Sequence, residues 1–400
     1  MNMNVVIGLS AAVESAECEV QQKVVQRATG PYNRPMRPGP EKWSERFERF
    51  AEQECRGRSP LYETVSLELA GDGELLDWIA SVIGPRAHPT LLFAAVHHLL
   101  LAGADGADLA AFFPNMTDVP APPQRAYPAF RAFIQRERAR LAPLLAARVT
   151  QTNEVARCCY LLPAFVLAAK RSRKPLWIID VGASAGLNLL FDRYAYDYGV
   201  GRRAGAASSQ VKLRTELRGN PVATTPAPTI AGRVGLDLEP IDLDDDAQTR
   251  WLEACTWPEH VDRFRNLRAA LAIARREKPR VVKGNAIDAL PALVDEADRD
   301  AAVTIVNTNV MLYFSTEERA RYRRLLSELA AARELIWIAN EHPLLLAGAG
   351  FTAPIEQTKE PSALPLVMSR FVDGRRDDRV LAVVGAHARW LDWFGVEGAA

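Results

Sequence analysis

An acid and a turn of small residues stand between an apolar run and a helix-like run. Residues 177–181 are apolar except for Asp180, and Gly182-Ala183-Ser184-Ala185-Gly186 follows directly. Small residues let a backbone approach a ligand closely, and the first turn of a following helix offers N–H groups. The dinucleotide fingerprint G-x-G-x-x-G is not matched, because Ser184 and Leu187 stand at its second and third glycine positions. We therefore expect a ligand-binding turn of another kind, with Asp180, Gly182, Ser184 and Gly186 at the ligand.

The spacing acid-x-Gly-x-x-x-Gly resembles the first motif of Rossmann-like S-adenosylmethionine-dependent methyltransferases. Later segments fit the same order along the chain. Asp237 ends a second apolar run, where an acid can accept hydrogen bonds from both ribose hydroxyls. Asn285 and Ala286 follow a third apolar run. They take the place of the Gly-Asp-Ala loop that contacts adenine in such enzymes, with Asn in place of Asp. A fourth run ends in the polar residues that would face the methyl group, namely Asn307, Asn309 and Tyr313.

The same small-residue turn also matches the G-x-S-x-G turn on which serine hydrolases carry their nucleophile. Ser184 would then be the nucleophile and His387 its base. In an α/β-hydrolase several strands precede that turn, whereas here about 135 residues of helical pattern precede it, without a His-Gly-Gly oxyanion motif. The hydrolase is therefore the less favoured hypothesis.

The segment Thr150-Gln151-Thr152-Asn153-Glu154-Val155-Ala156-Arg157 is polar and leads into the helix before the first strand. A threonine cap with Glu154 in the first turn would explain it structurally. Alternatively Asn153, Glu154 and Arg157 line the ligand cleft, with Arg157 facing a carboxylate of the ligand or substrate. Both interpretations stay open.

The elements that must position these residues fall into two regions. From residue 41 to 149 apolar residues recur at spacings of three and four, which predicts helices, and four prolines in 31–40 predict that 1–40 is a disordered tail. From residue 150 to 400 strands alternate with helices, with a Gly- and Pro-rich insertion at 196–231. The predicted strands are Leu176–Val181, Arg233–Leu238, Arg280–Gly284, Val303–Asn307, Leu335–Ala339, Leu364–Phe371 and Val380–Val384, the last two forming an antiparallel hairpin. The predicted helices are Leu187–Tyr194, Ala247–Arg276, Ile287–Glu296 and Thr316–Ala332.

Composition excludes several classes of protein. Lys and Arg number 49, as do Asp and Glu, so a formal net charge of zero provides no field for holding nucleic acid or an anionic membrane. Five cysteines without a C-x-x-C pair indicate a reducing, cytoplasmic location rather than a disulfide framework. The adjacent His97 and His98 point to different sides of a helix, and Asp244-Asp245-Asp246 is typical of a helix start, so no metal site is expected.

The chain also resembles a bacterial family known as domain of unknown function 2332, over about residues 43 to 393. The motifs that carry this resemblance are Ser59-Pro60-Leu61-Tyr62, Ala95-Val96-His97-His98-Leu99-Leu100, Thr150-Gln151-Thr152-Asn153-Glu154, Val181-Gly182-Ala183-Ser184-Ala185-Gly186-Leu187-Asn188-Leu189, Asp192-Arg193-Tyr194, Glu216-Leu217-Arg218-Gly219, Val234-Gly235-Leu236-Asp237-Leu238 and Arg389-Trp390-Leu391-Asp392-Trp393. This sequence departs from the family pattern in two places. Val306-Asn307-Thr308 replaces a Phe-His-Ser or Phe-His-Thr, and Ala386-His387-Ala388 replaces a Pro-His-Gly.

Together these observations predict an α/β fold of the Rossmann-like methyltransferase type, with a mostly parallel sheet, a C-terminal antiparallel hairpin and an N-terminal all-helical region. The predicted function is methyl transfer from S-adenosylmethionine to a small molecule, with the helical region as a lid. Because methyl transfer is a direct displacement, positioning supplies much of the rate and a strong base is optional. The alternative from another class is a non-catalytic ligand-binding or scaffold protein of the same fold, which the asparagines at 285 and 307 motivate.

Overall fold

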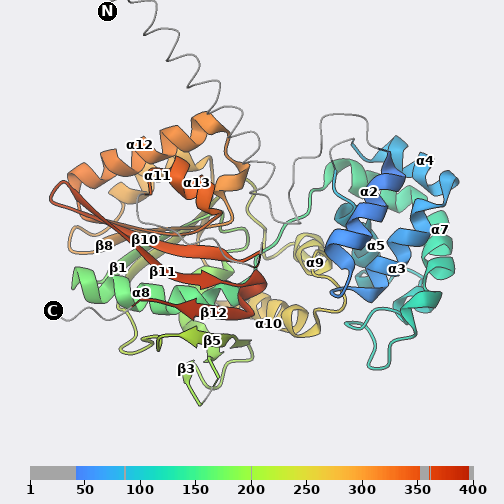
Figure 1. Cartoon of the computed structure of the whole chain (residues 1–400), viewed down its shortest axis with the longest axis horizontal. Helices are drawn as coiled ribbons and strands as arrows, with labels where there is room; N and C mark the ends of the chain where they lie inside the picture. Colours follow the sequence, from blue (N-terminus) through green and yellow to red (C-terminus); the bar gives the residue numbers. More distant parts are fainter. Residues whose placement is uncertain (1–41, 85–86, 200, 352–359, 361, 396–400) are drawn as a thin grey trace, which may run out of the picture.

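The computed structural model describes residues 42–84, 87–199, 201–351, 360 and 362–395. The predicted tail at 1–40 lies outside the described residues. Figure 1 shows a bundle of helices beside a sheet that is covered by helices on its two faces. We refer to residues 43–147 as the helical part and to residues 155–395 as the α/β part. The predicted fold class is confirmed: an N-terminal helical region precedes a mostly parallel sheet with a C-terminal antiparallel stretch.

The helical part is built from short helices around an aromatic core. Two of its helices begin at side-chain caps, since Ser59 Oγ accepts from Tyr62 N and Asp72 Oδ1 accepts from Leu75 N. Phe93 lies at the centre of the core and stacks on Tyr62 with 4.1 Å between ring centroids. The helices are α2 (Trp43–Phe50), α3 (Pro60–Ala70), α4 (Gly73–Val82), α5 (Thr90–Leu101), α6 (Ala107–Ala110) and α7 (Tyr127–Ala147), with the π-helical turn η1 (Ala51–Cys55) and the 3-10 turn η2 (Pro123–Arg125).

A segment of the α/β part completes this core. The single helix predicted at Ala247–Arg276 is wrong, because the chain forms α9 (Asp246–Ala254) and α10 (Val261–Glu277) with a break between them. Pro258 cannot donate a helical N–H within the break. The preceding Trp257 is 6% exposed and packs against the rings of Phe50 and Tyr62. The stabilisation from burying this indole in the helical part therefore exceeds the stabilisation that one continuous helix would provide.

A nine-stranded sheet forms the α/β part, in the order β5-β12-β11-β10-β9-β8-β1-β6-β7. β7, β6, β1, β8 and β9 are parallel, and β10 pairs antiparallel with both β9 and β11, as the predicted hairpin requires. All seven predicted strands are present, and β5 and β12 extend the sheet beyond them. The strands are β1 (Leu176–Val181), β5 (Glu216–Gly219), β6 (Ile230–Asp237), β7 (Val281–Lys283), β8 (Ala302–Thr308), β9 (Leu335–Asn340), β10 (Leu364–Val372), β11 (Arg375–Val384) and β12 (Trp390–Trp393).

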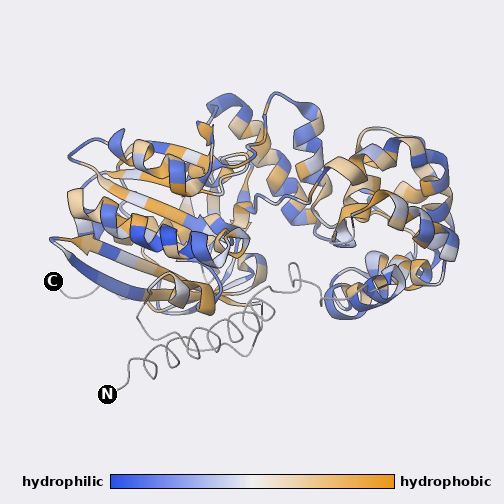
Figure 2. Ribbon diagram, turned by 90° about the horizontal axis from the view of Figure 1, so that it is seen from above, coloured by the Kyte–Doolittle hydropathy of each residue, from blue (hydrophilic) through white to orange (hydrophobic). Residues whose placement is uncertain are grey.

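Helices on both faces explain why the central strands are almost wholly apolar. In Figure 2 the strands are predominantly orange, whereas the outer sides of the covering helices carry much of the blue. The first face packs on α8 (Cys158–Ser172) and α10, and the second packs on α11 (Ala286–Asp295), α12 (Thr316–Ala332) and α13 (Pro343–Gly348). The side chains of a strand alternate between the two faces. Ile178 and Asp180 therefore lie on the α8 face, and Ile179 and Val181 on the α11 face.

Two local predictions differ from the structure. The helix predicted at Leu187–Tyr194 is the 3-10 turn η4 (Leu187–Arg193), in which Leu190 leaves helical geometry. Three short strands that overlap the predicted insertion at 196–231 form a second sheet in the order β3-β2-β4. These strands are β2 (Ala195–Asp197), β3 (Arg203–Gly205) and β4 (Lys212–Arg214). No helix in the described part of the chain is long and apolar enough to cross a membrane.

The role of Trp257 is testable by Trp257→Ala. Emptying this fully packed site should lower the free energy of unfolding by about 3–5 kcal/mol, measured by urea denaturation followed by circular dichroism. Trp78→Ala is the matched control, since Trp78 on α4 is only partly buried. Equal losses in the two variants would contradict the anchoring role.

Candidate functional site

The strand order reverses between β1 and β8, and we refer to the region at the carboxyl ends of these two strands as the crevice. From β1 the chain first adds β6 and β7 on one side, and then crosses to β8 and β9 on the other. In open α/β sheets ligands bind where the order reverses in this way. The crevice is bordered by the turn after β1 and by the loop after β8. Both contain residues that the sequence singles out.

The turn after β1 is held in a conformation that glycine favours. Gly182 and Gly186 have φ values of 78° and 71°, and Ser184 adopts φ 53° although it has a side chain. A Cβ at position 182 would collide with the side chain of Val310, which follows β8. The two loops that border the crevice are therefore in contact at Gly182.

Asp180 is a buried carboxylate at this point of the sheet. The residue is 4% exposed, and its Oδ2 has no hydrogen-bond partner among the described residues. Burial raises the pKa of Asp180 to about 7, with Arg157 opposing the shift and Asp237 adding to it. The hydroxyl of Ser184 is likewise buried without a partner in the described part of the chain. Buried polar atoms are seldom left unsatisfied, and a polar ligand at this turn would supply the partners that these two atoms lack.

The predicted ribose and adenine residues lie at the adjacent strand ends. Asp237, at the end of β6, accepts from Ser184 N at 2.8 Å and from Glu239 N at 2.9 Å. Its backbone oxygen accepts from Gly284 N, which brings the loop after β7 alongside. Asn285 caps α11 by accepting from Ile287 N, and Ala286 begins that helix. Asp237 and Asn285 thus have structural contacts already, and both side chains remain partly exposed.

The segment from Asn153 to Arg157 lies across the same edge of the sheet. Asn153 Oδ1 accepts from Leu187 N, at the start of η4. Arg157 ends the 3-10 turn η3 (Val155–Arg157) and donates from Nη1 to both the backbone oxygen and the hydroxyl of Thr308, at 2.9 Å each. Glu154 is itself the N-cap of η3, because its Oε1 accepts from Ala156 N, so the predicted threonine cap with Glu154 in the first turn is wrong.

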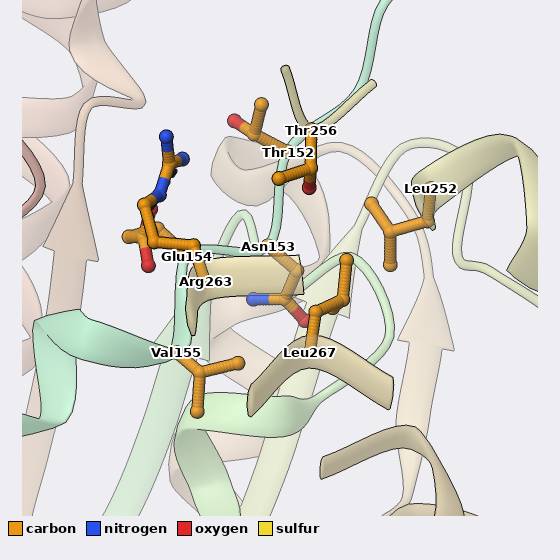
Figure 3. Close-up of a pocket in the computed structure, with 8 residues that line it drawn as sticks. All are labelled: Thr152, Asn153, Glu154, Val155, Leu252, Thr256, Arg263 and Leu267. Atoms are coloured by element: carbon orange, nitrogen blue, oxygen red, sulfur yellow. Dashed lines mark hydrogen bonds and ion pairs between the residues drawn. The ribbon is translucent and has the colours of Figure 1, made fainter. Parts of the chain in front are cut away.

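Glu154 also joins a cluster of charged and imidazole groups. Its Oε2 accepts from Arg263 Nε at 2.7 Å and lies 3.2 Å from Nδ1 of His387, which belongs to the turn η6 (Ala386–Ala388). Burial opposes ionisation of Glu154, but Arg263 and His387 outweigh burial and hold the pKa of this carboxyl well below its usual range. Figure 3 shows Glu154 and Arg263 at a cavity of about 20 Å³, which accommodates one water molecule. The other lining residues are Thr152, Asn153, Val155, Leu252, Thr256 and Leu267.

Asn307 faces away from the α8 side of the sheet. It is 1% exposed, its Nδ2 donates to Glu341, and its Oδ1 accepts from Trp337 Nε1 at 2.6 Å and from the hydroxyl of Tyr322. Both the nitrogen and the oxygen of its amide are therefore engaged inside the core formed with α12. Glu341 also accepts from the backbone of the loop after β8, at Val310 N and Met311 N.

The other two residues predicted to face the methyl group lie in the loop after β8. Asn309 takes a left-handed φ of 55° and donates its N–H to the backbone oxygen of Asn340. Tyr313 belongs to the 3-10 turn η5 (Met311–Tyr313) and is 68% exposed. The structure thus brings Asp180, Ser184 and Asp237 together with Arg157, and separates Asn307 from them.

Sequence reasoning did not select Glu341, Arg263 or His260. Glu341 directly follows the apolar strand β9, and an acid at a strand end was the signal that could have found it. Arg263 and His260 lie at the start of α10, where the sequence predicted the middle of one continuous helix. Their contacts with Glu154 and His387 depend on tertiary structure.

The hydrolase hypothesis finds no assembled triad among the described residues. The hydroxyl of Ser184 has no hydrogen-bond partner there, and Nδ1 of His387 lies against Glu154. A serine nucleophile needs a base within hydrogen-bond reach. The described residues also contain no group of three His, Cys, Asp or Glu side chains arranged to hold a metal ion.

Comparison with known proteins gives three findings. A solved structure, the PH0226 protein from Pyrococcus horikoshii OT3, is 11% identical with a TM-score of 0.21, covering 55% of this chain and 72% of that chain. No match is found among curated proteins. The model of the family described as "Uncharacterized protein conserved in bacteria (DUF2332)" matches residues 44–393, and the chain belongs to that family.

Proposed function

We propose that this protein binds S-adenosylmethionine in the crevice at the carboxyl ends of β1 and β8 and transfers its methyl group to a small molecule. The observation that carries the proposal is Asp180, a buried carboxylate at the place where the strand order reverses, with one oxygen that finds no donor among the described residues. A carboxylate kept in such a position is stabilised by a cationic ligand. S-adenosylmethionine carries a positively charged ammonium group.

The residues present fit the rest of that cofactor. Arg157 supplies a guanidinium beside Thr308 for the cofactor carboxylate, while Asp180 Oδ2 is available to accept from the ammonium. Asp237, at the neighbouring strand end, has the acceptor capacity for ribose hydroxyls, and Asn285 and Ala286 follow β7 on the adenine side. The cofactor supplies an electrophilic methyl group on a positively charged sulfur.

The chain's own contribution is to orient the reactants and exclude water. Ala183 and Ala185 are fully buried, and Val310 packs over Gly182, so the backbone of the turn is shielded from solvent. Orientation and desolvation supply much of the rate of a direct displacement. A second function, binding the cofactor without transferring its methyl group, is favoured by one observation, namely that the Asn307 amide is committed to the core. Demethylated cofactor that accumulates with any acceptor excludes this second function.

The first measurement is calorimetric titration with S-adenosylmethionine and with its demethylated product. Asp237→Ala should weaken the binding of both ligands by about 1–3 kcal/mol, the scale of a lost buried hydrogen-bonding partner. Asp237→Asn keeps one acceptor oxygen and should lose less binding free energy. Absence of binding to folded wild-type protein overturns the proposed function.

The amino-acid end of the cofactor provides a second test. Methylthioadenosine lacks the ammonium and carboxylate, so Asp180→Asn and Arg157→Gln should weaken the binding of S-adenosylmethionine while leaving that of methylthioadenosine nearly unchanged. The same calorimetric titrations measure the difference. Equal losses for the two ligands would show that these residues do not contact the amino-acid end.

The raised pKa of Asp180 also predicts a dependence of stability on pH. Because its folded-state pKa of about 7 lies above the unfolded value, the folded state binds the extra proton, and stability falls as pH rises from about 4 to about 7. Asp180→Asn removes this loss, so its advantage over wild type in urea denaturation should be absent near pH 4 and reach on the order of 4 kcal/mol at pH 8. A constant difference across that range contradicts the assignment.

A further inference from the structure

A buried carboxylate outside the proposed cofactor residues holds the loop after β8. Glu341 directly follows β9 and is 1% exposed. Its Oε1 accepts from Val310 N at 2.7 Å, from Met311 N at 3.2 Å and from Asn307 Nδ2 at 2.9 Å. An oxygen has two lone pairs, so three donors on one oxygen favour a negatively charged acceptor. The ionised carboxylate is therefore the form that binds the loop most strongly.

Further contacts of this loop are made by groups that keep their charge. Asn309 turns the chain with its left-handed φ of 55° and donates its N–H to the backbone oxygen of Asn340. Arg319 on α12 donates from Nε to the backbone oxygen of Met311 at 3.0 Å. Backbone groups and an arginine have the same charge throughout the neutral pH range. Glu341, in contrast, can gain or lose a charge at its contact with the loop.

The loop that Glu341 holds packs against the turn after β1. A Cβ at position 182 would collide with the side chain of Val310, and Gly182 stands two residues after Asp180. Two of the hydrogen bonds to Glu341 come from the N–H groups of Val310 and of the next residue, so they fix the backbone that carries this side chain. A shift of the loop would therefore separate the two borders of the crevice beside Asp180.

The charge of Glu341 depends on pH close to neutrality. Burial raises the pKa of this carboxyl to about 6, although its hydrogen bonds to the loop and the charge of Arg157 act in the opposite direction. The charged and titratable groups that act on it or feel its charge from other elements are Arg157 of η3, Arg319 and Tyr322 of α12, and Tyr160 of α8. The arginines stay protonated, and burial raises the pKa of both tyrosines above the usual range. None of these four groups therefore changes its charge near pH 6.

Arg157 connects Glu341 to the proposed cofactor residues. Its charge lowers the pKa of both Glu341 and Asp180, which places the guanidinium near both carboxyl groups. Its Nη1 donates to Thr308, the last residue of β8. The loop after β8 is thus held at its first residues from two sides, by an arginine at Thr308 and by a carboxylate at Val310. Both contacts lie at the crevice.

We propose that Glu341 is a positioning residue for the cofactor: its ionised carboxylate holds Val310 against the turn after β1, and the hold weakens when the carboxylate takes up a proton. The inference rests on the proposed function and adds to it one residue and one dependence on pH. Glu341 acts through the loop and does not touch the cofactor itself. S-adenosylmethionine therefore binds more tightly to the protein in which Glu341 is ionised.

The coupling between the carboxylate and the loop is measurable without cofactor. Proton–nitrogen NMR spectra of isotope-labelled protein follow the backbone amides of Val310 and Met311 as the pH changes. Both amide proton shifts should show an inflection near pH 6, the pKa of Glu341, and Glu341→Gln should abolish it. Asp180→Asn removes the other buried acid of raised pKa at the crevice and should leave the inflection in place. No inflection in folded wild-type protein, or one that survives Glu341→Gln, overturns the inference.

Calorimetric titration with S-adenosylmethionine at several pH values tests the effect on the cofactor. Glu341→Gln imitates the protonated carboxylate at every pH, so its Kd should exceed that of wild type by about twofold near pH 5 and by about tenfold near pH 7.5. Taking the ratio at each pH cancels the titration of Asp180, which both proteins retain. Glu259→Gln is the matched control, since Glu259 also has a raised pKa and accepts from a backbone N–H, that of Leu61 in the helical part. Its ratio should not change with pH.

The wild-type protein provides a measurement that needs no variant. By linkage, a cofactor that binds about tenfold more tightly to the ionised form must itself favour ionisation by the same factor. Saturating S-adenosylmethionine should therefore move the inflection of the Val310 amide from near pH 6 to about pH 5. An inflection that stays in place overturns the positioning role, even where Glu341→Gln does not fold.

The outcomes separate the inference from the proposed function. A Kd ratio that is raised but constant with pH shows a merely structural role for Glu341, and a ratio of about 1 at every pH shows no role at all. Either result overturns the inference and leaves the cofactor site standing. Failure of folded wild-type protein to bind S-adenosylmethionine overturns the proposed function, and this inference with it.

Discussion

The contacts of Arg157 with Thr308 organise the carboxyl edge of the sheet. They hold the segment from Asn153 to Arg157 against the end of β8, and Asn153 holds the same segment against the start of η4. Glu154, between them, can then meet Arg263 and His387. Residues 153–157 are thus the meeting point of four distant parts of the chain, which are the start of η4, the start of α10, the end of β8 and η6. An arginine suits this position because it can donate several hydrogen bonds in a fixed geometry while keeping its charge near a buried acid.

Asp180 represents the energetic cost of this arrangement. A buried carboxylate with an unsatisfied oxygen destabilises the folded protein, and the nearby charge of Arg157 offsets only part of the cost, because the pKa remains raised. Glu341 is buried too, but one of its oxygens accepts three hydrogen bonds, two of them from the loop after β8. Glu341 therefore supports the structure of the loop after β8, whereas Asp180 has an oxygen that is suited to a ligand.

The helical part is joined to this edge through the break between α9 and α10. Trp257 is buried against Phe50 and Tyr62, and Glu259, two residues later, accepts from Ser59 Oγ and Leu61 N at the start of α3. His260 follows immediately and stacks on Trp257 with 3° between the ring planes. The position of the His260 imidazole therefore depends on packing inside the helical part.

The sequence by itself determined the elements whose signals are local. Short β-rich runs located all seven predicted strands, and Gly182 and Gly186 marked a turn whose left-handed backbone favours glycine. The sequence did not predict the break at Trp257-Pro258, because the residues against which the Trp257 indole packs belong to another part of the chain. Only tertiary structure decided the face on which each polar side chain acts: strand alternation puts Asn307 and Asp180 on opposite faces, but the helix that covers each face depends on long-range packing. The partners of Glu154 lie 109 residues away at Arg263 and further still at His387, so no local pattern contains that cluster.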